Sequence, residues 1–266
     1  AITPWNYPIS MITRKLGPAL AAGCTVVLKP AEATPLTAVE VFKIFEDAGF
    51  PPGVVNLVTG ADPKPIGEEF TSNPKVAKLT FTGSTAVGKM LAGKAAANMK
   101  RVSCELGGHA PFIVLKDADP VHAAKGLQLV KFLNTGQACI SPNRVFVHRD
   151  VLESFLETFA GRVGGMKAGN GMEQGVTIGP LVNEAAVAKV ENQVKDAVAM
   201  GAEVLCGGER LTDGDLGQGH FFAPTVLNNV TPDMLIYREE TFGPVAAVVP
   251  FDDDDDVLAM ANDTHY

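Results

Sequence analysis

Short apolar runs alternate with amphipathic runs along this chain, and this alternation constrains the fold more than any other feature of the sequence. Gly, Pro or Asn separates most of the runs. In the first part of the chain, the expected helices lie at residues 11–22, 36–47, 64–70 and 85–97, and the expected strands at 25–29, 54–58, 78–82 and 101–105. Strands that alternate with helices predict an α/β fold with a parallel sheet.

A second series of strands and helices follows Gly108. Its expected strands lie at residues 112–115 and 144–148, and its expected helices at 121–133, 151–161 and 184–200. We therefore place a domain boundary near Gly107 and Gly108, which gives domains at residues 1–107 and 108–266. Neither a linker nor a fixed repeat separates the two series, so we expect them to pack against each other around a ligand-binding crevice.

Composition and charge argue against several classes of function. The chain has 266 residues and a formal net charge of −8, with five consecutive aspartates at residues 252–256. Such a run repels nucleic-acid phosphates, and because an apolar helical pattern follows it, a solvated helix start is favoured over a cation site. No uncharged apolar run is long enough to span a membrane, and the four cysteines lack metal or disulfide spacing, so we expect a cytoplasmic protein.

Cys139 is the strongest candidate for a nucleophile. It lies in Asn134-Thr-Gly-Gln-Ala-Cys139, a glycine-containing stretch directly after an expected helix. Backbone dipoles in such a turn can stabilise a thiolate that remains accessible to a substrate. Cys24 precedes an expected strand, Cys104 ends another, and Cys206 follows Glu203 to Leu205. We interpret each of them as a small core residue.

A turn of small residues at 81–89, between an expected strand and an expected helix, is suited to bind an anion. Its backbone N–H groups would point at a bound phosphate. Gly83 to Lys89 also fits the G-x-x-x-x-G-K pattern of nucleotide triphosphatases, but Met90 stands where that pattern needs Ser or Thr to hold magnesium. Phosphate hydrolysis is therefore disfavoured, and a purely structural turn remains an alternative.

Two glutamates at expected strand ends are further candidates. Glu32, in Lys29-Pro-Ala-Glu32, can accept hydrogen bonds from a ribose diol and repel a 2′-phosphate, which favours NAD over NADP. A surface ion pair between Lys29 and Glu32 without function is the alternative. Glu105 precedes Leu106 and two glycines, which allow the backbone to bend and direct the carboxylate into a crevice, although a lone glutamate at a strand end is commonly a surface residue.

The five histidines form no metal-binding pattern, and neither an H-E-x-x-H motif nor a His-Cys cluster occurs. We interpret the histidines as surface or capping residues. The sequence therefore predicts no metal site.

Six motifs occur in one order along the chain. They are Pro4-Trp-Asn6, Lys29-Pro-Ala-Glu32, Phe81-Thr-Gly-Ser-Thr85, Glu105-Leu-Gly-Gly108, Gly136-Gln-Ala-Cys139 and Glu240-Thr-Phe-Gly-Pro244. Together they closely resemble the aldehyde dehydrogenase superfamily over the whole chain. The resemblance implies a partial Rossmann-like cofactor domain up to about Gly107 and a partial α/β catalytic domain beyond it.

The resemblance also implies a role for each candidate residue in catalysis. Cys139 would attack the aldehyde to give a thiohemiacetal, while the Asn6 side chain and the Cys139 backbone N–H stabilise the oxyanion. Hydride would then pass to nicotinamide, leaving a thioester. Glu105 would activate water to hydrolyse that thioester to the carboxylic acid.

For the cofactor, the resemblance implies that Lys29 and Glu32 hold the adenosine ribose and that Gly83 and Ser84 hold the pyrophosphate. Glu240 would bind the nicotinamide ribose, with Phe242 beside the ring. Trp5 and Leu106 would line the nicotinamide site. The expected cofactor is NAD, with NADP less favoured.

Within the superfamily, the stretches at residues 11–15 and 105–114 are most similar to succinate-semialdehyde dehydrogenases. Arg14 would then bind the substrate carboxylate. Those enzymes commonly carry a second arginine where this chain has Leu133. That difference leaves the identity of the aldehyde open.

Full-length members of the superfamily extend beyond both ends of this chain, so we expect the chain to be a central fragment. The full-length protein is expected to form a homo-oligomer. Two alternatives to NAD-dependent oxidation remain. One is an inactive fragment or noncatalytic remnant of such an enzyme. The other is a CoA-acylating enzyme that uses the Cys139 thioester and does not need Glu105.

Overall fold

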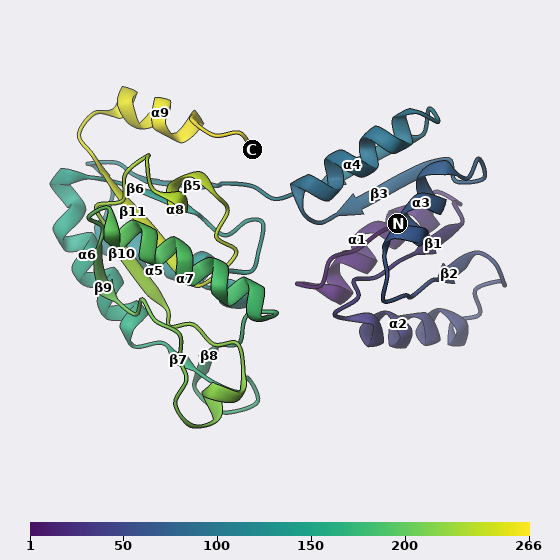
Figure 1. Cartoon of the computed structure of the whole chain (residues 1–266), viewed down its shortest axis with the longest axis horizontal. Coiled ribbons are helices and arrows are strands. Elements are labelled where there is room, and N and C mark those ends of the chain that lie inside the picture. Colours follow the sequence, from purple (N-terminus) through teal and green to yellow (C-terminus); the bar gives the residue numbers. More distant parts are fainter. The chain divides into compact units, whose positions relative to one another are not determined.

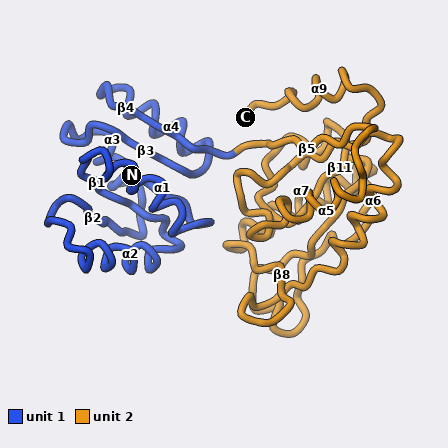
Figure 2. Tube along the Cα trace, turned by 180° about the vertical axis from the view of Figure 1, so that it is seen from behind, with its two compact units in different colours: residues 1–107 blue, residues 108–266 orange.

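The computed structural model describes residues 1–266 and divides them into two compact units, Ala1–Gly107 and Gly108–Tyr266 (Figures 1 and 2). The boundary lies where the sequence changes from one series of elements to the next. The cofactor-binding role of the first unit and the catalytic role of the second stay predictions.

The first unit is built on short parallel strands that alternate with helices. Its helices are α1 (Pro8–Ala21), α2 (Pro35–Asp47), α3 (Lys64–Ser72) and α4 (Thr85–Ala96), and its strands are β1 (Val26–Leu28), β2 (Val55–Leu57), β3 (Lys78–Thr82) and β4 (Arg101–Glu105). β1 pairs with β2 and β3 with β4, both in parallel. The expected parallel arrangement is confirmed.

The first residues of the chain join these two pairs of strands. Ile2 forms parallel bridges to Lys29, at the end of β1, and to Phe81 in β3. The Ile2 backbone N–H donates to the Thr80 carbonyl at 2.9 Å, and the Thr3 N–H donates to the Lys29 carbonyl at 3.1 Å. The strands of the unit therefore follow the order β2, β1, residues 1–3, β3 and β4.

Two small hydrophobic clusters fill the first unit. Ile12, Leu28 and Ala38 belong to the cluster around α1, α2 and β1. Leu79 and Leu91 belong to the cluster around α3, α4 and β3. All five side chains are buried, so each helix holds its strand by its apolar face.

The second unit contains a five-stranded sheet of order β5-β6-β11-β10-β9 (Figure 1). Its strands are β5 (Pro111–Val114), β6 (Arg144–His148), β9 (Glu203–Cys206), β10 (Thr225–Asn228) and β11 (Val245–Phe251), and its helices are α5 (Pro120–Lys131), α6 (Arg149–Gly164), α7 (Glu184–Ala199), α8 (Leu235–Arg238) and α9 (Asp254–Asn262). Only β9 runs antiparallel to its neighbour. The short strands β7 (Lys167–Ala168) and β8 (Val176–Ile178) form a separate pair, and two 3₁₀ turns, η1 (Leu133–Gly136) and η2 (Gly214–Gln218), complete the unit.

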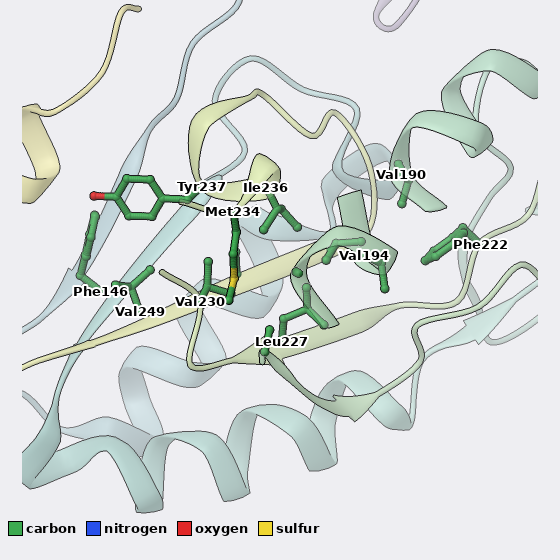
Figure 3. Close-up of a cluster of buried hydrophobic side chains, with 14 of the residues drawn as sticks. Phe146, Val190, Val194, Phe222, Leu227, Val230, Met234, Ile236, Tyr237 and Val249 are labelled. Carbon is green, nitrogen blue, oxygen red and sulfur yellow. The ribbon is translucent and has the colours of Figure 1, made fainter. Parts of the chain in front are cut away.

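Helices cover both faces of this sheet. Phe146 of β6 belongs to a cluster with Val190 of α7 and Tyr237 of α8, which Figure 3 shows. Its neighbours in β6, Val145 and Val147, point into the other cluster, which includes residues of α5 and α6. Successive residues of one strand are thus buried on opposite faces, as is usual for parallel sheets.

Most expected elements agree with the structure within a few residues at each end, but the strands β7 to β11 and the short helix α8 were not predicted. The interpretation of the acidic run is confirmed, because the Asp253 side chain caps α9 and accepts from Asp255 N–H at 2.8 Å. Two readings were wrong: Cys24 is exposed and not part of the core, and His109 is buried and not at the surface. No helix is both long enough and apolar enough to cross a membrane.

Candidate active site

Cys139 is exposed in a loop whose backbone makes an unusual reversal. Directly after α5, η1 contains Asn134, Thr135 and Gly136, which have φ values of 50°, 62° and 75°. Three consecutive residues in the left-handed region are rare, and for a residue other than glycine this conformation costs about 1–3 kcal/mol. Tertiary contacts must therefore hold this loop in place.

Two buried polar side chains supply these contacts. Thr135 Oγ1 accepts a hydrogen bond from Gly179 N–H at 3.0 Å and lies 3.2 Å from the Gly179 carbonyl, to which it donates. Gln137 Nε2 donates to the Pro180 carbonyl at 3.2 Å, and its Oε1 accepts from Val182 N–H at 2.9 Å. The loop is thereby fixed to the segment that follows β8.

A close approach of two backbones fixes the other side of the loop. A Cβ atom at Gly136 would lie 2.1 Å from the Gly243 carbonyl oxygen and 3.3 Å from the Lys131 carbonyl oxygen. Only glycine fits this space. The Cys139 loop therefore packs directly against the segment that contains Glu240 and Phe242, and Phe242 itself has a left-handed φ of 53°.

Glu240 is held by the backbone of the site. Its Oε1 accepts from Gly108 N–H at 3.3 Å, and Lys189 Nζ donates to the Glu240 carbonyl at 3.0 Å. Burial raises the pKa of the Glu240 carboxyl, while the Gly108 hydrogen bond and the nearby charges of Lys189 and Lys131 act in the opposite direction.

Lys131, the last residue of α5, is fully buried. Its Nζ has no hydrogen-bond partner. Burial lowers the pKa of Lys131 to about 7, and the charge of Glu240 counteracts only part of that shift. The sequence reading did not identify Lys131, because nothing in its local pattern distinguishes a buried lysine from one on the surface.

In the first unit, Lys29 and Glu32 form an ion pair after the end of β1. The Lys29 side chain is 5% exposed and that of Glu32 is 39% exposed. Lys29 Nζ also donates to the Pro30 carbonyl at 3.0 Å. Because the ammonium group is buried and the carboxylate is at the surface, the group presented to a ligand is negative.

The turn between β3 and α4 brings three more candidates together. Gly83 N–H donates to the Glu105 carbonyl at 3.1 Å. Ser84 is the N-cap of α4, and its side chain accepts from Val87 N–H at 3.4 Å. A Cβ atom at Gly88 would lie 2.3 Å from Leu106 Cδ2, so glycine at this position lets Leu106 pack against the first turns of α4.

Glu105 is exposed at the end of β4. Lys15 of α1 is buried, and its Nζ donates to Thr80 Oγ1 at 3.0 Å. Burial lowers the pKa of Lys15, and the negative charge of Glu105 raises it in part. Lys15 is thus a charged neighbour of the predicted base that the sequence reading did not single out.

The remaining candidates of the first unit lie at the start of α1 and along it. Trp5 and Asn6 are half-buried directly before the helix. Arg14 is exposed on α1 and makes no ion pair in the structure, so its guanidinium is available to an anion. No group of three or more His, Cys, Asp or Glu side chains is arranged to hold a metal ion.

The model of the aldehyde dehydrogenase family matches residues 1–266 of the chain. This chain belongs to that family. It is 51% identical to the mitochondrial succinate-semialdehyde dehydrogenase of Oryza sativa subsp. japonica over 265 residues, which is 100% of this chain and 49% of the relative. It is 50% identical to the succinate-semialdehyde dehydrogenase [NADP(+)] GabD of Escherichia coli, covering 100% of this chain and 54% of the relative.

The solved structures give the same family and fold. The crystal structure of succinate-semialdehyde dehydrogenase from Burkholderia pseudomallei has a TM-score of 0.95 and 51% identity, covering 99% of this chain and 54% of that one. The resemblance to succinate-semialdehyde dehydrogenases and the α/β fold class are therefore confirmed. The chain spans about half the length of the relatives it matches.

Proposed function

We propose that this chain carries the nucleophile, the base and the cofactor-contacting residues of an enzyme that oxidises a semialdehyde, such as succinic semialdehyde, to the carboxylic acid with NAD. The observation that carries the proposal is the loop of Cys139. An exposed thiol stands on a backbone reversal that buried Thr135 and Gln137 hold rigid. A rigid, accessible thiol is what nucleophilic catalysis requires.

The first chemical step is addition of the Cys139 thiolate to the aldehyde carbon. The carbonyl oxygen becomes an oxyanion, for which the Cys139 backbone N–H and the Asn6 amide are the proposed donors. When NAD is bound, its nicotinamide ring supplies the acceptor for the hydride that leaves this carbon. The bond between Cys139 and the substrate is then a thioester.

The second step is hydrolysis, with Glu105 as the general base. Glu105 takes a proton from water, the resulting hydroxide adds to the thioester carbon, and the Cys139 thiolate leaves. The product is a carboxylic acid. This role for Glu105 separates the proposal from a CoA-acylating enzyme, in which CoA would accept the acyl group.

The residues of the first unit fit a dinucleotide. Gly83 and Ser84 lie at the N-terminus of α4, where backbone N–H groups and the helix dipole favour a pyrophosphate. Glu32 presents its carboxylate outward above the buried Lys29. That arrangement favours a ribose diol over a 2′-phosphate and supports NAD over NADP. Leu106, Trp5, Glu240 and Phe242 are the proposed contacts of the nicotinamide half.

Arg14 is the proposed anchor of the substrate carboxylate, because its exposed guanidinium has no partner within the chain. Arg14→Gln is expected to raise KM for succinic semialdehyde about tenfold or more, and to leave KM for butyraldehyde, which lacks the carboxylate, nearly unchanged. An equal effect on both aldehydes would reject Arg14 as the anchor.

The deciding experiment measures NADH formation from NAD and succinic semialdehyde with two matched variants. Cys139→Ser is expected to abolish NADH formation. Cys24→Ser removes the other exposed thiol and is expected to leave the rate unchanged. Equal rates for Cys139→Ser and the unchanged chain would reject the proposed nucleophile, and no NADH from the unchanged chain would favour the inactive-fragment alternative.

A further inference from the structure

Three loops of the second unit meet at a single buried amide that belongs to none of the six motifs. Asn143 lies directly before β6 and is 2% exposed. Its backbone N–H donates to the Ala110 carbonyl at 3.0 Å. Its side chain is therefore fixed at the start of a central strand, inside the protein.

Every polar atom of that side chain is used. Nδ2 donates to the Gly108 carbonyl at 3.3 Å and to the Ser141 carbonyl at 3.4 Å. Oδ1 accepts from Thr241 N–H at 3.1 Å. A buried amide with both donor and acceptor occupied fixes its neighbours more strictly than apolar packing does, because an unmade hydrogen bond here costs about 1–3 kcal/mol.

The three partners belong to the three loops that carry the proposed chemistry. Ser141 lies two residues after Cys139. Thr241 directly follows Glu240, and Gly108 donates its own N–H to Glu240 Oε1. One side chain thus links the nucleophile loop, the Glu240 loop and the segment that begins at Gly108.

We propose that Asn143 is a positioning residue that sets the distance between Cys139 and Glu240. It touches neither the aldehyde nor the cofactor and acts through the backbone of its three partners. The catalytic meaning of this link rests on the proposed function, but the link itself concerns only the folded chain. Two arms of the test therefore measure the link without any turnover.

The first arm measures hydrogen exchange of backbone amides in three variants. In Asn143→Ala, exchange is expected to become about tenfold faster or more at Thr241, which loses its acceptor, and around residues 108 and 141. In Asn143→Asp, the carboxylate still accepts from Thr241 N–H but cannot donate. Thr241 should therefore stay protected while the other two segments open.

Asn228 of β10 supplies the matched control. It is also buried, at 7% exposure, and the one hydrogen bond of its amide is donated to the Glu203 carboxylate, at 3.5 Å. Asn228→Ala is expected to lower stability without opening the three loops. If the three segments stay protected in Asn143→Ala, or open equally in Asn228→Ala, the proposal is overturned.

The second arm measures alkylation of Cys139 by iodoacetamide, with the exposed Cys24 of the same chain as internal reference. Release of the loop changes the position and the surroundings of the Cys139 thiol, so the rate of alkylation of Cys139 relative to Cys24 should differ by about fivefold or more between Asn143→Ala and the original chain. A ratio unchanged from that of the original chain would show that Asn143 is only structural.

The third arm measures turnover, as kcat and KM for the aldehyde. A shift of about 1 Å in a reacting group can cost a factor of about 100. Asn143→Ala is therefore expected to lower kcat by about 10- to 100-fold in folded protein, with KM for the aldehyde little changed. If the loops open but kcat is retained, the positioning role fails. If the unchanged chain has no activity, the proposed function fails while the two other arms still decide whether Asn143 links the loops.

Discussion

The two units position their proposed site residues in different ways. In the first unit these residues stand at the ends of regular elements: Glu105 closes β4, and Gly83 and Ser84 join β3 to α4. In the second unit Cys139 and Glu240 stand in loops, where left-handed backbone and buried polar side chains fix them.

It follows that the two parts of the proposed site depend on different interactions. A residue at a strand end keeps its position as long as the sheet forms. The loop of Cys139 has no such support and depends on Thr135, Gly136, Gln137 and Asn143, each with specific partners. Small changes in these residues should therefore have larger effects than equal changes in the first unit.

The largest effect is expected from a single methyl group. Gly136→Ala places Cβ against the Gly243 carbonyl at a left-handed φ, and should lower the free energy of unfolding of the second unit by about 3 kcal/mol or more. Gly93 lies in α4 with open space around it, so Gly93→Ala should raise the free energy of unfolding of the first unit by about 0.5–1 kcal/mol. Urea denaturation measures both, and a tolerated Gly136→Ala would contradict a rigid loop.

The next effect concerns the buried Lys131. Its pKa is about 7 in the folded chain against the ordinary 10.5, so between these pH values the unfolded chain binds a proton that the folded chain does not. Stability is therefore lost as pH falls from 10.5 to 7, and the loss stays constant below 7. Lys131→Met should remove it, stabilising the second unit at pH 7 by about 1–4 kcal/mol and much less above pH 10.5.

Lys125 provides the control for that experiment, because it lies exposed on the same helix. Lys125→Met is expected to change thermal stability little at either pH. A gain from Lys131→Met that does not depend on pH would indicate that the gain comes from packing and not from the charge.

Smaller effects should distinguish the tertiary hydrogen bonds that hold the Cys139 loop from the local cap that holds the turn before α4. Thr135→Ala removes both hydrogen bonds to Gly179 and should cost the second unit about 1–3 kcal/mol and lower kcat. Ser84→Ala removes a single exposed capping bond and should cost the first unit about 0.5–1 kcal/mol. Equal costs in urea denaturation would remove the contrast between the units.

The smallest effect on stability is expected at Glu32. Glu32→Gln removes a charge at the surface but keeps an oxygen that can accept from the buried Lys29 ammonium, so stability should change by less than about 1 kcal/mol. The ratio of kcat/KM for NADP to that for NAD should rise several-fold, because the repulsion of a 2′-phosphate is removed. Glu40→Gln removes a carboxylate from an exposed pair with Lys43 at the same i, i+3 spacing and should leave the ratio unchanged. If Glu32→Gln also leaves the ratio unchanged, Glu32 does not determine the selectivity.

The sequence predicted the first and last residues of some elements correctly. The expected bounds of β3, β4 and β6 agree with the structure. β11 was missed although it lies at the centre of its sheet. It follows Gly243 and Pro244, which favour a loop, and burial on both faces removes the alternation that identifies a strand.

The residues of the candidate site also fall into those that the sequence could identify and those that it could not. Cys139, Glu105 and Glu32 could be selected from local patterns, because a thiol in a glycine-containing turn or a carboxylate at a strand end differs from its neighbours in the sequence. Their roles stay predictions. Lys131 and Asn143 could not be selected, since a lysine at a helix end and an asparagine before a strand are ordinary until their burial is known.

The sequence by itself determined the alternation of strands and helices, the family and the chemical groups available to the site. These follow from local periodicity and from motifs that need no distant partner. Only the tertiary structure decided that Gly136 meets Gly243, that Lys131 is buried without a hydrogen-bond partner and that Asn143 joins three loops. The approach of Gly136 to Gly243 and the hydrogen bond between Asn143 and Thr241 each join segments about 100 residues apart in the chain, and such contacts leave no local signal.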